Sequence, residues 1–428
     1  MLARAGDAVG TAGEGRVVRP CSSACSVWSQ PPRGQRCAGE IGHASLLCAA
    51  PCSLRLLAGP LLLKTGRRAA LAAYWPGLNG QLQTVSSSFR RPVMDAVRPP
   101  LVAVDSLVVD VLTDNVSDTY VSKPSFAVSE FANVLRAGAQ VISGPGLLCA
   151  NLGYGLRLVT THQGVRHTLL FDTGPDGPIF LRNCANLGIR LEEVECIAVT
   201  HGHWDHMAAL PEAVRAIVSG GGKVTVHVNP DMFNERAIKL KSGRIVPVAK
   251  VPTPAELEAL GAAVVNHGDA RLLLDGHFWY SGPIPRVSSF EKGRIDHLCR
   301  LAPDAPWQPD PLLMDERMLV VHVRDLGLIV FSACSHAGIV NVCTHASQIF
   351  AGTPIYAVMG GLHLGGVMER IIPETVEGLR PFKIPNIITG HCTGWRALHA
   401  LADAYGSAVS ESAVGTTYTF DESHHLTL

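Results

Sequence analysis

Four side chains that can bind a metal ion lie within six consecutive residues of the chain. The segment Thr200-His201-Gly202-His203-Trp204-Asp205-His206 supplies three imidazoles and one carboxylate. These groups are the ligands that Zn²⁺, Fe²⁺ and Mn²⁺ accept in proteins. His201 and His203 are two residues apart, so an extended loop can send both to one side. Asp205 and His206 then turn toward a second position, and this spacing predicts two neighbouring metal ions.

The elements on either side of this segment would hold it in place. Val194 to Thr200 reads as a buried strand, and Ala208 to Val218 reads as a helix. The ligands would therefore extend from a strand end, where the sheet fixes one side of the loop. Lys223 to Val228 predicts a further strand, and we interpret His227 within it as an ordinary packed side chain.

Further strands and helices are predicted on both sides of the metal loop. Ser106 to Leu112 reads as a strand that ends in a polar turn, from which we predict that Asn115 contacts the substrate. The chain also predicts two hairpins, around Gln163-Gly164 and Arg324-Asp325-Leu326, and a helix over Ile179 to Leu187. Strand-rich halves that each carry helices indicate an α/β fold with two packed sheets and helices outside.

Several motifs together resemble those of the metallo-β-lactamase superfamily. Beside the HxHxDH motif, the supporting segments are Leu169–Gly174, in which a strand ends in Asp-Thr-Gly, then Val330–Gly338 and Ile387–Trp395. The resemblance covers roughly residues 101 to 428. It implies an αβ/βα four-layer sandwich, with ligands delivered from strand ends along one edge.

A narrower resemblance points to one branch of this superfamily. The segments that carry it are Cys334–Asn341, Gly360–Leu364, Gly390–Gly394 and Ser281–Arg286. The branch is described as dihydropteroate-synthase-like, or as 7,8-dihydropterin-6-methyl-4-(β-D-ribofuranosyl)aminobenzene-5'-phosphate synthase-like. That description names a pterin-linked transferase, whereas many members are simply called metal-dependent hydrolases.

The resemblance implies a ligand for each position of a two-metal site. The first metal would be held by His201, His203 and His336, and the second by Asp205, His206 and His391. An aspartate commonly bridges both metals in this superfamily, but Cys334 or Ser335 stands at that place here. Cys334 is therefore either a thiolate ligand or a packed thiol, since a bound metal would lower its pKa.

Other residues are expected to act around the metals. Asp205 is the candidate catalytic residue, because its carboxylate could orient a hydroxide or accept a proton. Asp172 is expected to brace the metal loop by hydrogen bonds rather than to bind metal. His363 is either a donor to a substrate oxyanion or phosphate, or a structural turn residue. Arg286 is either an anchor for an anionic substrate or a solvated side chain.

These residues favour a metal-dependent hydrolase with two divalent metals, most simply zinc. Its metal-bound hydroxide would attack an ester, phosphodiester or amide of a small molecule. The alternative is a transferase that joins a dihydropterin diphosphate to an arylamine ribofuranosyl phosphate, with the metals stabilising the departing diphosphate. A third possibility is an iron-containing redox or sensing site, because three histidines and an aspartate also accept iron.

Composition excludes several other classes of function. Lys plus Arg and Asp plus Glu number 36 each, and aromatic residues make up only 6% of the chain. No basic, base-stacking surface is indicated, so nucleic acid is not an expected partner and a nuclease is disfavoured. The partner is expected to be a small molecule, and a homo-oligomer is possible. No membrane association is expected, because Pro51, Arg55 and Pro60 interrupt the apolar run near residues 46–63.

The N-terminal part of the chain differs in composition from the rest. Residues 1–93 hold ten arginines against three acidic residues. We interpret 1–100 as a disordered low-complexity extension, either transit-like or an over-extended start, and 101–428 as the domain. Twelve scattered cysteines and no clear secretory signal favour a cytoplasmic protein over a secreted antibiotic hydrolase, with organelle import possible. Within the domain, residues 230–311 are expected to be an insertion that shapes the substrate pocket.

Overall fold

The computed structural model describes residues 99–423, and their strands form three sheets. The predicted extension therefore lies almost entirely outside the described residues. In spatial order, the first sheet holds β10 (Ala263–Asn266), β7 (Thr225–Val228), β6 (Cys196–Ala198), β5 (Val165–Phe171), β4 (Gly155–His162), β2 (Ser106–Thr113), β20 (Thr417–Asp421) and β3 (Ala127–Val128).

The second sheet comes mainly from the C-terminal part of the chain. It holds β11 (Arg271–Leu273), β12 (Phe278–Tyr280), β15 (Leu319–Val323), β16 (Gly327–Ser332), β17 (Ile355–Gly361), β18 (Asn386–Gly390) and β19 (Val409–Glu411), with β1 (Ala103–Val104) beside β15. Strands β16 to β19 are parallel, so their carboxyl ends meet at one edge. The third sheet is smaller, with β14 (Gln308–Pro309), β13 (His297–Arg300), β8 (Glu235–Lys239) and β9 (Ile245–Pro247).

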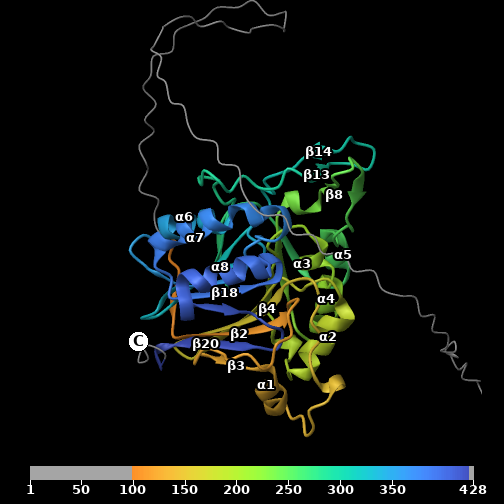
Figure 1. Ribbon diagram of the computed structural model, residues 1–428. Helices are drawn as coiled ribbons and strands as arrows, with labels where there is room; N and C mark the ends of the chain where they lie inside the picture. The colour runs from red at the N-terminus through yellow and green to blue at the C-terminus, as the bar shows by residue number, and fades with distance from the viewer. Residues whose placement is uncertain (1–98, 424–428) are drawn as a thin grey trace, which may run out of the picture. The chain divides into compact units, whose positions relative to one another are not determined.

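Helices pack on the outer faces of the two large sheets. They are α1 (Glu130–Arg136), α2 (Gly177–Asn186), α3 (Trp204–Met207), α4 (Leu210–Ser219), α5 (Pro254–Ala259), α6 (Ile339–Ile349), α7 (Ile372–Leu379) and α8 (Trp395–Tyr405). Short 3₁₀ turns lie at Gly144–Gly146, Leu191–Glu193, Pro230–Phe233, Gly366–Ile371, Arg380–Phe382, His391–Thr393 and Gly406–Ala408. Figure 1 shows α6, α7 and α8 on the side of β18, and α2 and α4 beside the opposite layer. Among residues 99–423, no helix combines the length and apolar character that a membrane crossing requires.

Three apolar layers hold these elements together, and each follows from the alternation of side chains along a strand. On β5, Leu169 and Phe171 face the second sheet, whereas Leu170 faces α2 and α4. On the second sheet, Val321 faces inward and Val320 faces the helices α6 to α8. The order is therefore helices, sheet, sheet, helices, as the predicted αβ/βα sandwich requires.

The hairpins and helices that the sequence predicts near the site are present, with adjusted limits. Gln163 and Gly164 both have positive φ, as a two-residue turn between twisted strands requires. The helix predicted over 179–187 is α2, and the helix predicted over 208–218 begins later, as α4. The strand predicted over 194–200 is shorter, because Thr200 leaves the sheet to bond with the side chain of Asp172.

The segment predicted as an insertion, residues 230–311, does not form one separate unit. Strands β8, β9, β13 and β14 build the third sheet, which lies near α3 in Figure 1. Strands β10, β11 and β12 instead join the two large sheets, because β10 pairs with β7 and β12 pairs with β15. The boundary was therefore too wide, and only the third sheet and its loops stand apart from the sandwich.

Candidate metal centre

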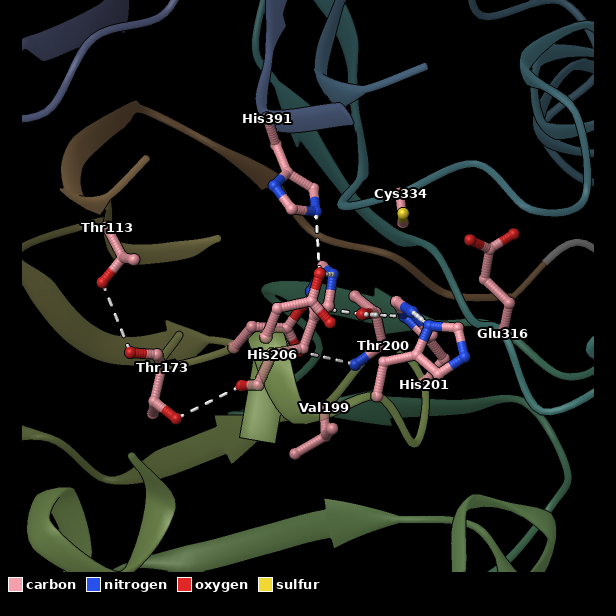
Figure 2. A network of polar contacts seen from close by, with 12 residues as sticks. Thr113, Thr173, Val199, Thr200, His201, His206, Glu316, Cys334 and His391 are labelled. Carbon is pink, nitrogen blue, oxygen red and sulfur yellow. Dashed lines mark hydrogen bonds and ion pairs between the residues drawn. The ribbon is translucent and has the colours of Figure 1, made fainter. Parts of the chain in front are cut away.

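The loop after β6 is tied to the sheet by one buried carboxylate. Asp172, which follows β5 with φ 58°, accepts hydrogen bonds from the backbone N–H and the hydroxyl of Thr200 at 2.8 and 2.6 Å. Aspartate is among the residues that tolerate this left-handed conformation. The same carboxylate lies 2.7 Å from Nδ1 of His206. Asp172 thus holds the metal loop by hydrogen bonds. Figure 2 shows Thr200, His201 and His206 of this loop close together, with His391 above them.

This contact fixes the proton of His206 on the nitrogen that faces away from the other histidines. Asp172 can only accept at that position, so Nδ1 of His206 carries the hydrogen. Nε2 of His206 is then free of hydrogen, is buried, and has no hydrogen-bond partner among the described residues. A carboxylate that orients a histidine in this way is a common support of metal sites.

Three histidines from two distant segments form the first cluster. His201 and His203 follow β6, and His336 follows β16. Their ring centroids lie 4.6 to 5.0 Å apart. Nε2 of His201 is 2.9 Å from Nδ1 of His203. Burial lowers the pKa of each ring well below its ordinary value, so all three are neutral, the form that binds metal.

The second cluster joins Asp205, His206 and His391. The rings of His206 and His391 lie 5.0 Å apart, and Oδ2 of Asp205 lies 3.9 and 3.5 Å from their Nε2 atoms. Burial would raise the pKa of Asp205, but the neighbouring imidazoles outweigh burial and lower it, so the carboxylate is ionised. Burial likewise opposes protonation of His391, but Cys392 and Asp205 outweigh it and raise its pKa to about 9.

Backbone contacts position the two histidines of the C-terminal half. The N–H groups of His336 and Ala337 donate to the carboxylate of Glu316 at 2.7 and 2.6 Å. The N–H of His391, whose φ is 47°, donates to Oδ1 of Asp114 at 2.9 Å. Glu316 and Asp114 are buried, and sequence reasoning missed both, because their partners lie far away in the chain.

Cys334, and not Ser335, occupies the place between the two clusters. Its sulfur forms one group with ligand atoms of His201 and His336 and a second group with those of His206 and His391, and within each group the atoms lie within 4.8 Å of one another. The hydroxyl of Ser335 instead bonds to Ser332 and to the carbonyl of Gly361. Of Cys334 and Ser335, the cysteine therefore lies at the bridging position, where the superfamily commonly has an aspartate.

The ligand atoms fit a divalent metal, and unsatisfied nitrogens support this. Nε2 of His206, Nε2 of His336 and Nδ1 of His391 are buried without a hydrogen bond to the described residues. Buried polar groups are nearly always paired, so a cluster of unpaired nitrogens implies a missing partner. Imidazoles, one carboxylate and one thiol are a donor set that suits zinc or iron rather than magnesium or calcium.

A cavity of about 310 Å³ opens over both clusters. Its polar lining consists of His203, Asp205, Arg236, Arg294, His297, Asp310, Cys334, His336, His363, His391 and Cys392. Its apolar lining includes Leu152, Ile238, Val248, Leu298 and Leu313. Strands β8 and β13 of the third sheet contribute Arg236, Ile238, His297 and Leu298, so this sheet forms a wall of the cavity.

Two of the residues predicted to bind substrate do not line this cavity. Asn115 is exposed, and the buried Asp114 beside it is the residue that reaches the site. The guanidinium of Arg286 donates to the backbone carbonyls of Ile284, Leu312 and Leu313, so it holds a loop together. Neither position is therefore placed to contact a substrate in the cavity. His363 does line the cavity, as does Asp205.

Arg294 and His297 line the cavity, where Arg286 was expected. Arg294 is ion-paired with Asp296, and its Nη1 lies 3.4 Å from Nε2 of His363. His297 is buried above the first cluster, and Nδ1 has no hydrogen bond among the described residues. Burial lowers the pKa of His297 to about 3, so the ring is neutral. Both lie in the weakly periodic stretch of the sequence, where no motif marks them.

Comparison with known proteins agrees with this geometry. Residues 158–289 match the family model of the metallo-beta-lactamase superfamily. The chain is 27% identical over 247 residues to the 7,8-dihydropterin-6-methyl-4-(beta-D-ribofuranosyl)-aminobenzene-5'-phosphate synthase of Methanocaldococcus jannaschii, covering 57% of this chain and 82% of that protein.

A solved structure shows the same fold. Tm1679, described as a metal-dependent hydrolase of the beta-lactamase superfamily, aligns with a TM-score of 0.55 at 19% identity, over 74% of this chain and 100% of that one. The match to the family model includes the metal loop, and the structural match extends over a larger part of the chain. The chain therefore has the fold of the metallo-β-lactamase superfamily, and residues 158–289 are similar to its family model.

Proposed function

We propose that the protein is a metal-dependent hydrolase that cleaves an ester, phosphodiester or amide bond of a small anionic molecule. The observation that carries the proposal is the set of buried, unpaired imidazole nitrogens from both halves of the chain around one cavity. A bound divalent ion at such a site lowers the pKa of water and polarises the bond to be cleaved. Zinc is the proposed metal, because histidine and cysteine donors suit it.

The residues of the site would have three roles, which are metal binding, orientation of water and support of a ligand. His201, His203 and His336 would hold one ion, and Asp205, His206 and His391 the other, with Cys334 between them. Asp205 is ionised and partly exposed to the cavity, so its carboxylate can orient a water molecule and accept a proton. Asp172 keeps the ring of His206 in the orientation and tautomer that ligation requires.

The walls of the cavity favour a substrate with an anionic group and an apolar part. Arg294 places a guanidinium in the lining, next to His363, and guanidinium groups bind phosphates and carboxylates well. Arg236 also lines the cavity but is paired with two carboxylates, Asp310 and Asp315, whereas Arg294 is paired with Asp296 alone and has its Nη1 beside His363. Ile238, Leu298 and Leu313 supply an apolar surface on the same side.

This assignment of Arg294 can be tested by substitution. Arg294→Met should raise KM by about tenfold or more for an anionic substrate and change kcat less, because the lost contact is made in the ground state as well. Arg300→Met is the matched control, since Arg300 lies on β13 but pairs with Glu235 and does not line the cavity. Equal KM values for the two variants would remove Arg294 from substrate binding.

A transferase is the second candidate, and similarity to the synthase of Methanocaldococcus jannaschii favours it. That relative is called a synthase for a dihydropterin-linked aminobenzene phosphate. In a transfer reaction, Arg294 and the metals would hold the departing diphosphate of a dihydropterin, and the arylamine would take the place of water. The cavity must then admit two substrates at once rather than one substrate and a water molecule.

One experiment separates the two candidates. The full chain, loaded with zinc, is incubated with a dihydropterin diphosphate and an arylamine ribofuranosyl phosphate, and separately with phosphodiester and ester substrates. Mass spectrometry detects the coupled product or the hydrolysis products. Hydrolysis that is lost on chelation and in His203→Ala supports the proposal, whereas a coupled product with no hydrolysis supports the transferase. Full hydrolytic activity in chelated His203→Ala protein would overturn the metal-dependent mechanism itself.

A further inference from the structure

Two thiols and an imidazole meet beside the histidine clusters. Sγ of Cys334 lies 3.1 Å from Sγ of Cys392 and 3.3 Å from Nδ1 of His363. The three ligand atoms lie within 4.8 Å of one another, and neither cysteine is in a disulfide. All three residues line the cavity, so solutes can reach them. Neither the predicted two-metal ligand set nor the proposed hydrolytic steps use Cys392.

The topology of the second sheet brings these residues together. Cys334, His363 and Cys392 follow the neighbouring parallel strands β16, β17 and β18, whose carboxyl ends lie side by side. Residues at such strand ends converge on one edge although they are about thirty positions apart in the chain. The cluster is therefore a product of the fold, and no short motif in the sequence contains it.

Local backbone features keep space for the sulfur atoms. His363 has φ 49°, a conformation that is uncommon outside glycine and recurs at functional sites. A Cβ at Gly361 would lie 2.7 Å from Sγ of Cys392, so a glycine is needed there for the thiol to occupy its place. These two positions shape the turn after β17 around the thiols.

The donor atoms of the cluster also suit a cation. Cysteine ligates metals as the thiolate, and a bound cation itself favours that form. Two sulfurs and one imidazole form a ligand set that zinc and other thiophilic ions accept, with a further position left for solvent or substrate.

We propose that Cys334, His363 and Cys392 bind a third divalent cation of thiophilic type, beside the two positions formed by the histidine clusters. Cys334 is common to all three ligand groups, so its sulfur would be shared between neighbouring ions. Binding exchanges the remaining thiol protons for the cation, with no change of oxidation state. The proposal concerns ligation alone and stands whichever bond the enzyme cleaves.

Cobalt substitution of the full chain tests this site. The protein is stripped with a chelator in the presence of a reductant and titrated with Co²⁺, which gives visible bands from histidine ligation and a strong near-ultraviolet band from sulfur ligation. We expect about three ions per chain, and about one fewer in Cys392→Ser, with part of the sulfur band lost, since Cys334 still ligates the neighbouring ions, and the visible bands retained. His363→Ala should also lose one ion, which provides a second variant if Cys392→Ser folds poorly.

Cys299→Ser is the matched control, because Cys299 is half-buried and does not line the cavity. Its cobalt stoichiometry and spectrum should equal those of the unmodified chain. Equal stoichiometry in Cys392→Ser, His363→Ala and the control would overturn the third site. A disulfide between the two thiols would also overturn it. Under peroxide-free conditions, this disulfide would lower the mass by 2 Da relative to the reduced chain, and Cys392→Ser would not show this difference. Loss of the visible bands in every variant would instead count against the histidine clusters.

Discussion

The loop after β6 and the loops after β16, β17 and β18 supply the same site in different ways. The first loop delivers His201, His203, Asp205 and His206 from one short segment. The second sheet delivers one histidine from each strand end, with a cysteine beside two of them. The N-terminal half of the site is therefore a local motif, and the C-terminal half exists only when the parallel strands are paired in register.

The buried carboxylates that support the two halves also differ, in the part of the ligand residue that they contact. Asp172 holds the ring nitrogen of a ligand, whereas Glu316 and Asp114 hold backbone N–H groups of ligand loops. Loss of the first should change how a ligand ring is oriented. Loss of Glu316 or Asp114 should loosen a ligand loop, whose imidazole could still reach the position for metal binding. The comparison therefore separates effects on metal affinity from effects on stability.

The largest expected effect tests whether both halves are needed. His201→Ala and His336→Ala each remove one ligand of the first cluster, from opposite halves of the site. Each should lower kcat/KM by more than about a thousandfold, and the double variant should be little worse than either, because ligands of one ion act as a unit. Activity and metal content measured on the same samples check this. An active His336→Ala enzyme would mean that the N-terminal motif suffices.

A smaller effect is expected when the support of a ligand is changed rather than the ligand. Asp172→Asn keeps an oxygen for the N–H of Thr200 but places an amide nitrogen toward Nδ1 of His206. His206 would then have to carry its proton on Nε2, the ligand atom. Metal affinity should fall by about 10- to 100-fold, measured by competition with a chromophoric chelator. Asp403→Asn, an exposed position on α8, is the control and should bind metal like the unmodified chain.

How much of this site is visible in the sequence depends on the same difference between the halves. The HxHxDH motif and the Asp-Thr-Gly turn each consist of consecutive residues, so the sequence alone predicts that Asp172 braces the metal loop. The buried strands could also be predicted, because continuous apolar runs such as Leu169–Phe171 and Leu319–Val321 are typical of strands covered on both faces. Residues that act through a partner far away in the chain, such as Glu316 and Asp114, left no such signal.

The wall of the cavity was the least predictable part. The segment 230–311 has weak periodicity, and its strands divide between the third sheet and the two large sheets. Arg286, the last residue of the family-like segment Ser281–Arg286, is predicted to anchor an anion or to be solvated, yet its guanidinium donates to backbone carbonyls. Arg294, eight residues later, reaches the cavity instead. Which of two nearby arginines faces a pocket depends on loop geometry that composition and spacing do not encode.

The C-terminal counterpart of Asp172→Asn is Glu316→Gln. The amide oxygen can still accept one N–H group, but the N–H of either His336 or Ala337 would face an amide nitrogen. A buried donor left unpaired costs about 1 to 3 kcal/mol of stability. We expect a lower melting temperature for Glu316→Gln and a smaller loss of metal affinity than for Asp172→Asn. The reverse pattern would show that Glu316 acts on the imidazole rather than on the loop.

The smallest expected effect concerns Glu291, a buried carboxyl in the C-terminal half that no metal ligand touches. It accepts the N–H groups of Val340 and Asn341 at 2.8 Å, at the start of α6. Burial raises the pKa of Glu291 to about 7, above its value of 4.5 in an unfolded chain. Between these two values the folded state binds more protons than the unfolded state, so the stability that protonation provides is lost as pH rises.

The free energy of unfolding should therefore fall by about 1 kcal/mol between about pH 6 and about pH 7.5 through this group alone. Glu291→Gln removes the titration while keeping most of the shape, so its unfolding free energy should depend less on pH over that interval. Urea unfolding of both chains, stripped of metal, measures the difference. If the two pH profiles are parallel, Glu291 is ionised throughout, and the two N–H groups outweigh burial. The buried carboxyl would then resemble Asp172, and the contrast between the halves would be confined to the groups that the carboxylates contact.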